Sequence, residues 1–108
     1  MAIYYYFESD VTDSQMKEAV EFLTVFGYQQ HPTMDTSYYI GDGKNMVTFG
    51  SDRHLIQMEF WDTENYRDTF QQILDKFRTI FKVSSYALDL GCEKMSNQLN
   101  LEGLVRRE

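Results

Sequence analysis

The strongest periodic pattern in the chain is a row of apolar residues at helical spacing between residues 66 and 81. This spacing places the residues on one side of an α-helix, so we predict a helix whose apolar stripe faces a core. Asp62 or Thr63 would cap its first turn, where Glu64 suits the positive end of the helix dipole. The stripe consists of Tyr66, Phe70, Ile73, Leu74, Phe77, Ile80 and Phe81.

A shorter helix is predicted between Thr12 and Gly27. Thr12 and Gln15 have the spacing of a capping box, in which each side chain bonds the free backbone N–H group of the other residue. Gly27 would end the helix, because glycine adopts the left-handed C-terminal conformation without strain. Glu18 and Glu21 fall on its solvent side. The apolar positions of this helix are Met16, Ala19, Val20, Leu23 and Phe26.

Alternating apolar and polar residues, with many aromatic and β-branched side chains, predict strands in the rest of the chain. The turn Gly41-Asp42-Gly43-Lys44 predicts a hairpin between two of them, because glycine permits the positive φ values of such turns. Residues 83–90 also alternate, although a continuation of the second helix is the alternative. The predicted strands are residues 2–8, 36–41, 45–50, 54–61 and 83–90.

The predicted order of elements is β-α-β-β-β-α-β. Helices with one apolar side bury one face of a sheet, which gives a two-layer α+β sandwich with an antiparallel sheet of four to five strands and both helices on one face. We expect a single domain over residues 1–108. The sheet residues expected to meet the two helices are Ile3, Phe7, Ile56, Met58 and Phe60.

The C-terminal stretch, residues 93–108, has no clear pattern, and we expect a partly ordered tail. Four apolar residues could dock it on the body of the domain, whereas the last three residues are expected to fray. The docking residues would be Leu99, Leu101, Leu104 and Val105, and the fraying residues Arg106, Arg107 and Glu108.

The sheet face turned away from the helices is expected to be unusually aromatic and polar. It is too aromatic for simple exposure to solvent and too polar for a second core. Either the C-terminal tail or a second copy of the chain covers it, or it binds a partner, because Tyr and Trp give a large contact area at low entropic cost. Its predicted residues are Tyr4, Tyr6, Glu8, Tyr39, Thr48, Gln57, Glu59 and Trp61.

The charge of the chain is uneven. Residues 1–66 hold eleven acidic and three basic residues, residues 67–108 hold six acidic and seven basic ones, and the formal net charge is −7. A phosphate backbone repels such a surface, so direct binding of nucleic acid is disfavoured. No apolar run is long enough to span a membrane, residues 1–7 lack the basic start of a signal peptide, and one cysteine excludes an internal disulfide, so we expect a cytoplasmic protein.

No motif for catalysis or metal binding stands out. His31 and His54 lie far apart in the sequence without the ligand spacing of a metal site, and Cys92 lacks an obvious base. Glu8 and Glu59 could act as paired carboxylates on the open sheet face, although such acids more often keep a sheet soluble. We therefore expect no catalytic residues, no metal and no cofactor.

The first half of the chain, with Phe26-Gly27-Tyr28 after the first helix, resembles one module of the glyoxalase or vicinal-oxygen-chelate family. The ferredoxin-like fold is a second topological neighbour. The resemblance implies paired modules that build a metal site, but the histidine expected on the first strand is absent here. Fold similarity alone carries no function.

These observations predict a non-enzymatic inhibitor or antagonist of a basic protein that handles nucleic acid, such as a nuclease. Carboxylates would imitate phosphates and rings would anchor the partner on one shared surface, as in immunity proteins or phage counter-defence factors. The alternatives are a dimeric domain that binds a small molecule or acts as a metal-dependent enzyme, and a homodimeric assembly module. The predicted contact residues are Tyr4, Tyr6, Glu8, Asp10, Glu18, Glu21, Glu59 and Trp61.

Overall fold

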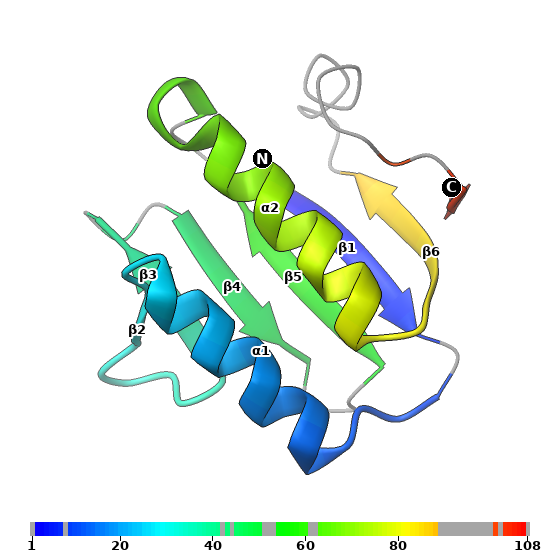
Figure 1. Ribbon diagram of the computed structural model, residues 1–108, viewed down its shortest axis with the longest axis horizontal. Coiled ribbons are helices and arrows are strands. Elements are labelled where there is room, and N and C mark those ends of the chain that lie inside the picture. Colours follow the sequence, from blue (N-terminus) through cyan, green and yellow to red (C-terminus); the bar gives the residue numbers. More distant parts are fainter. Residues whose placement is uncertain are drawn as a thin grey trace.

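The computed structural model is a two-layer α+β domain in which both helices lie on one face of a sheet (Figure 1). It describes residues 2–7, 9–41, 43, 45–50, 54–60, 63–88, 101 and 103–107, with only the backbone of residues 63–66. The predicted fold class is confirmed. The elements are β1 (Ala2–Phe7), α1 (Asp13–Val25), β2 (Gln29–Gln30), β3 (Ser37–Ile40), β4 (Asn45–Phe49), β5 (Leu55–Glu59), α2 (Thr63–Ile80), β6 (Val83–Leu88) and β7 (Val105–Arg106).

The sheet has seven strands in the order β2-β3-β4-β5-β1-β6-β7, so the first strand of the chain lies inside it. The five longer strands pair antiparallel, as predicted, and residues 83–88 form a strand and not an extension of α2. Two strands of two residues extend the edges beyond the predicted number. One of them, β7, runs parallel to β6 and makes the sheet mixed.

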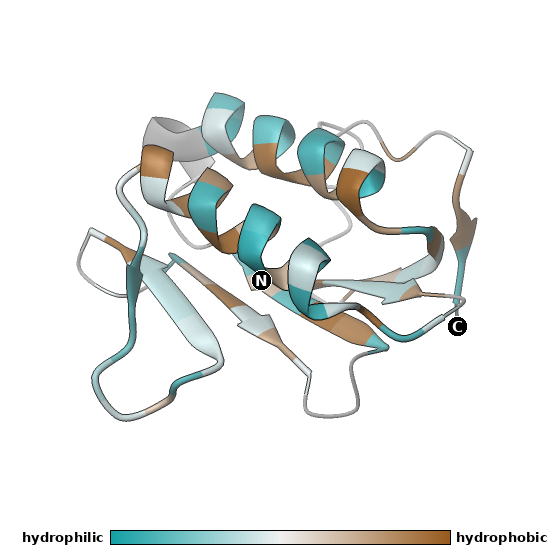
Figure 2. Ribbon diagram, turned by 60° about the horizontal axis from the view of Figure 1, so that its bottom comes forward, coloured by the Kyte–Doolittle hydropathy of each residue, from teal (hydrophilic) through white to brown (hydrophobic). Residues whose placement is uncertain are grey.

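The core lies between the helices and one face of the sheet. Figure 2 shows the hydrophobic sides of both helices turned toward the sheet. The predicted stripe of α2 is buried from Phe70 to Ile80, and the five predicted sheet residues are buried beneath the helices. Phe60 and Phe70 stack with their ring centroids 4.0 Å apart. Among the described residues, no helix is long and apolar enough to cross a membrane.

Helix α1 begins and ends with the caps that the sequence predicts. The Thr12 side chain accepts a hydrogen bond from the Gln15 N–H group, and the Gln15 side chain accepts one from the Thr12 N–H group, which completes the predicted capping box. At the other end, the N–H groups of Gly27 and Tyr28 bond the carbonyl groups of Thr24 and Leu23. This pattern is a Schellman motif, and it requires the positive φ of Gly27.

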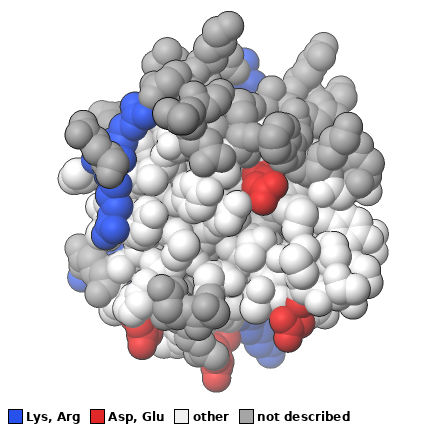
Figure 3. Space-filling view, turned by 180° about the vertical axis from the view of Figure 1, so that it is seen from behind, with Lys and Arg blue, Asp and Glu red and all other residues white. Residues whose placement is uncertain are grey.

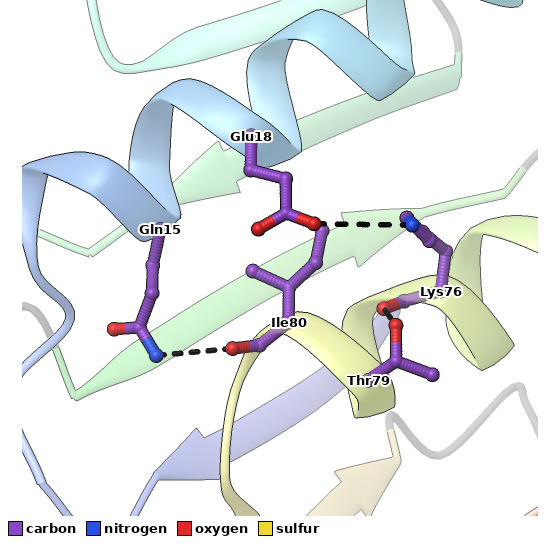
Figure 4. Close-up of polar contacts among 5 residues, drawn as sticks. All are labelled: Gln15, Glu18, Lys76, Thr79 and Ile80. Atoms are coloured by element: carbon purple, nitrogen blue, oxygen red, sulfur yellow. Dashed lines mark hydrogen bonds and ion pairs between the residues drawn. The ribbon is translucent and has the colours of Figure 1, made fainter.

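Gln15 also joins the two helices. Its side-chain Nε2 donates a hydrogen bond to the Ile80 carbonyl at the end of α2, over 3.0 Å (Figure 4). A carbonyl in the last turn of a helix has no partner within that helix, so this bond satisfies a group that would otherwise need water. Lys76 and Glu18 approach to 3.9 Å beside it, but both side chains are partly exposed and such pairs contribute little.

The C-terminal segment is more ordered at its end than the sequence predicts. Leu101 is buried and Leu104 packs against the core, as expected. Val105 does not dock, since it is 69% exposed. The prediction that Arg106 and Arg107 fray is wrong, because both lie along β6 and the Arg107 N–H group bonds the Tyr86 carbonyl over 2.7 Å. Leu99 and Glu108 lie outside the described residues.

Tyr5 is the largest fully buried side chain of β1, and its hydroxyl has no hydrogen-bond partner among the described residues. Burial raises the pKa of this hydroxyl well above its ordinary value, while the nearby Arg78 lowers the pKa and Asp75 raises it. Ionised Tyr5 is therefore incompatible with the packed core, and no hydrogen bond to a described residue offsets the burial of its hydroxyl.

We expect Gln15→Glu to lower the free energy of unfolding by about 1 kcal/mol, the typical contribution of one hydrogen bond. A carboxylate at this position still accepts from the Thr12 N–H group, but it cannot donate to the Ile80 carbonyl. Urea denaturation measures the change. Gln15→Ala, which removes the cap as well, should cost about 1 kcal/mol more. A Gln15→Glu variant as stable as the wild type would show that the bond between the helices contributes nothing.

We expect Tyr5→Phe to leave stability at pH 7 unchanged or to raise it by up to about 1 kcal/mol, because it removes a buried hydroxyl without a partner. A raised pKa in the folded state means that stability is complete below pH 10 and falls as pH rises above it, by about 1.4 kcal/mol per pH unit for one proton. Tyr5→Phe should remove that part of the alkaline loss. Urea denaturation at pH 7 and pH 11 tests both effects, and a strongly destabilised Tyr5→Phe at pH 7 would contradict them.

Candidate functional site

The sheet face away from the helices, which we call the open face, is built around a row of polar and aromatic side chains. Tyr4 of β1 pairs with Gln57 of β5, which pairs with Thr48 of β4, which pairs with Ser37 of β3. Residues paired across strands point to the same side, so the four side chains line one face. The Ser37 and Thr48 hydroxyls are 2.9 Å apart, which ties the row together at its β3 end.

A neighbouring row carries the carboxylate of this face. Glu59 pairs with Met46 on one side and Ala2 on the other, and Met46 pairs with Tyr39. Gln57 Nε2 donates to Glu59 Oε1 over 3.1 Å. Within the described residues of β1, β3, β4, β5 and β6, Glu59 is the one charged side chain. It is partly buried and lies at the end of β5, where it puts a negative charge in the row beside Gln57.

The third row meets the C-terminal segment. Tyr6 pairs with Leu55 and Ser85, and Ser85 pairs with Val105 of β7. Arg107 follows and reaches back over this row, with its guanidinium carbon 4.0 Å from the centroid of the Tyr6 ring. Its Nε donates to Ser85 Oγ over 2.8 Å. The C-terminal segment therefore covers one edge of the open face.

The described part of the open face has little charge. In Figure 3 its middle is largely uncharged, Lys and Arg side chains follow one edge, and acidic side chains lie mostly toward the rim. The described side chains that reach its surface include partly exposed tyrosines, Thr48 and Gln57, whereas Ser37 and Ser85 are buried. This composition suits contact with a protein better than the binding of free ions, because the centre of a protein interface is depleted of charged residues and enriched in aromatic ones.

The predicted contact residues do not form one surface. Tyr4, Tyr6 and Glu59 lie on the open face, as expected from their positions on the strands. Glu18 and Glu21 are exposed on α1, in the layer that covers the opposite face. One flat partner surface cannot contact both sets at once.

Of the remaining predicted residues, the structure describes Asp10. Asp10 lies in the loop before α1, where its Oδ1 is 2.7 Å from Nε2 of His54. Both side chains of this pair are about half exposed or more, so the contact orders the loop and contributes little to stability. The predictions for Glu8 and Trp61 lie outside the described residues.

Most of the negative charge also lies outside the described side chains. Those that are described include seven basic and eight acidic ones, a net charge of −1, whereas the whole chain has −7. Several described acids contact other groups, Asp10 with His54, Glu18 with Lys76 and Glu59 with Gln57. The described part of the molecule therefore presents no broad array of carboxylates resembling phosphates.

Arg107 is the residue of this site that the sequence did not predict. A basic residue near the end of a chain is usually solvated, and nothing next to it indicated a contact with Tyr6. The available signal was indirect. Leu101 and Leu104 pack against the core just before β7, and Arg107 directly follows β7. This anchoring holds Arg107 close to the sheet.

A pocket of about 330 Å³ lies beside the start of α1, at the ends of β1, β4 and β5. Its apolar walls could hold a small molecule, but neither Glu59 nor His54 lines it. Among the described residues, no group of three or more His, Cys, Asp and Glu could hold a metal ion. The pocket is lined by Phe7, Val11, Met16, Thr36, Phe49, Gly50 and Leu55.

Comparisons of the chain with protein-family models, with curated proteins and with solved structures found no match. The resemblance of its first half to a module of the glyoxalase type is thus a likeness of element order alone. No residue role follows from it.

Proposed function

We propose that the chain is a non-enzymatic protein-binding domain that holds a basic protein on its open face and inhibits or antagonises it. The observation that carries the proposal is the composition of that face: tyrosines and uncharged polar groups in paired rows, with Glu59 as the one carboxylate among the described residues of the longer strands. Surfaces of this kind match the centres of protein interfaces.

The rings would supply most of the binding energy. Tyr4 lies near the centre of the face, between Gln57 and Ala87, and Tyr39 lies toward its β3 edge. Tyrosine is enriched among the residues that dominate binding, because it buries a large area while fixing few torsions. Gln57 and Glu59 would accept or donate hydrogen bonds between the rings.

The negative charge would act mainly at a distance. A net charge of −7 attracts a cationic partner and speeds docking wherever the carboxylates lie, and salt weakens this attraction. We assign Asp10, Glu18 and Glu21 to this long-range role, because they are not on the open face. Such a surface would attract a basic cytoplasmic protein that binds nucleic acid. The chain would then act as an immunity protein or a phage counter-defence factor does.

Two alternatives lead to different observations on the purified protein. A homodimeric module would bury Tyr4 and Gln57 against a second copy, and sedimentation would then give a dimer at micromolar concentration. The apolar pocket beside α1 favours a different function, the binding of a small apolar molecule. In that case native mass spectrometry of the purified protein would detect a bound compound.

The test uses two substitutions that add the same charge to opposite layers. Gln57→Lys places a cation at the centre of the open face, whereas Gln72→Lys places one on the exposed side of α2. In affinity capture from a lysate, the wild type should retain a basic protein. Gln57→Lys should bind that protein at least tenfold more weakly, by about 1.4 kcal/mol, because it repels the partner and interrupts the contact.

Gln72→Lys is the control, and it should retain nearly the affinity of the wild type at physiological salt. Thermal denaturation of both variants establishes that they fold. The proposal fails if the captured protein is acidic, or if Gln57→Lys and Gln72→Lys retain it equally well.

A further inference from the structure

We propose that Tyr6 and Ser85 form a binding site for an arginine side chain of the partner, which Arg107 of the same chain occupies when no partner is bound. The inference rests on the proposed function, since it identifies one contact that a basic protein would make on the open face. It also names the chemical group recognised, a guanidinium, and the segment that has to move.

The site is defined by the contacts that Arg107 makes. Its guanidinium lies over the Tyr6 ring at 4.0 Å, and its Nε–H donates to Ser85 Oγ at 2.8 Å. Tyr6 and Ser85 are direct partners across β1 and β6, so the sheet fixes the ring and the hydroxyl relative to each other. Ser85 is 93% buried and Arg107 is exposed, so this hydrogen bond is partly shielded from water.

These contacts select arginine over lysine. A planar guanidinium can stack on an aromatic ring while one of its N–H groups donates sideways, whereas an ammonium group is compact and strongly hydrated. Tyr6 supplies the ring face, and Ser85 supplies the acceptor beside it. An acidic protein that recognises basic partners would gain specificity from such a site, beyond the attraction of its net charge.

Arg107 makes few other interactions with the described residues, so a partner could replace it. Strand β7 has two residues, both exposed, and the Arg107 N–H bond to the Tyr86 carbonyl continues its pairing with β6 by one residue. The segment before it is anchored by Leu101 and Leu104 in the core, so only the last few residues would have to leave the sheet. Two-residue pairing at a sheet edge is among the weaker parts of a fold.

The test titrates two peptides, Ac-Gly-Arg-Gly-NH2 and Ac-Gly-Lys-Gly-NH2, into the full-length chain and follows the backbone NMR signals of Tyr6 and Ser85. Arg107→Gln removes the guanidinium but keeps the backbone of β7. We expect the arginine peptide to bind Arg107→Gln at least fivefold more tightly than it binds the wild type. We also expect Arg107→Gln to bind the arginine peptide at least threefold more tightly than the lysine peptide.

A second variant, Arg107→Gln with Tyr6→Leu, should lose this gain, because leucine fills the position without a ring face. Equal binding to the wild type and to Arg107→Gln, no binding to either, or binding that survives Tyr6→Leu would overturn the proposal. Should Arg107→Gln fail to fold, the arginine peptide is titrated into the wild type and into the single variant Tyr6→Leu. Binding that Tyr6→Leu does not weaken would overturn the proposal.

This outcome is separate from that of the capture experiment, which probes Gln57 near the centre of the face. Failure of the peptide titration with a basic protein still captured would remove only the arginine site. Binding of the arginine peptide without capture of any basic protein would remove the proposed function.

Discussion

The alternation of side chains along β1 is the constraint on which both faces of the molecule depend. β1 lies between β5 and β6, so its two sets of side chains are directed to opposite layers. Ile3, Tyr5 and Phe7 are buried under the helices, and this burial forces Tyr4 and Tyr6 onto the open face. A shift of one residue would exchange the two sets, so the hydrophobic core itself places the candidate site.

The same argument explains how much of the fold the sequence predicted. The stripe of α2 and the capping box at Thr12 are local patterns that each predict one type of structure, and the alternation of residues 83–90 favoured the strand that is observed over a longer helix. The order of the elements then restricted the chain to a few topologies in which two helices cover one face of the sheet. Tyr4 and Glu59 were placed correctly on the open face because strand alternation alone decides their side.

The errors concern contacts between residues that lie far apart in the sequence. The second bond of Gln15, to Ile80, joins residues 65 positions apart, and the contact of Arg107 with Tyr6 joins the two ends of the chain. No local pattern encodes such pairs. The prediction that Glu18 and Glu21 share a surface with the rings was wrong for a related reason: both were correctly placed on the solvent side of α1, but that side belongs to the other layer.

Nitration of tyrosines by tetranitromethane, located by mass spectrometry, tests the central claim that β1 divides its tyrosines between two layers. The reagent attacks accessible phenolate, so Tyr4 and Tyr39 on the open face should react at least tenfold faster than Tyr5, whose burial raises its pKa. Mild modification that keeps the protein folded is required. Nitration of Tyr5 as fast as that of Tyr4 in the folded protein would contradict the account, because the open face and the core would then not be separated as described.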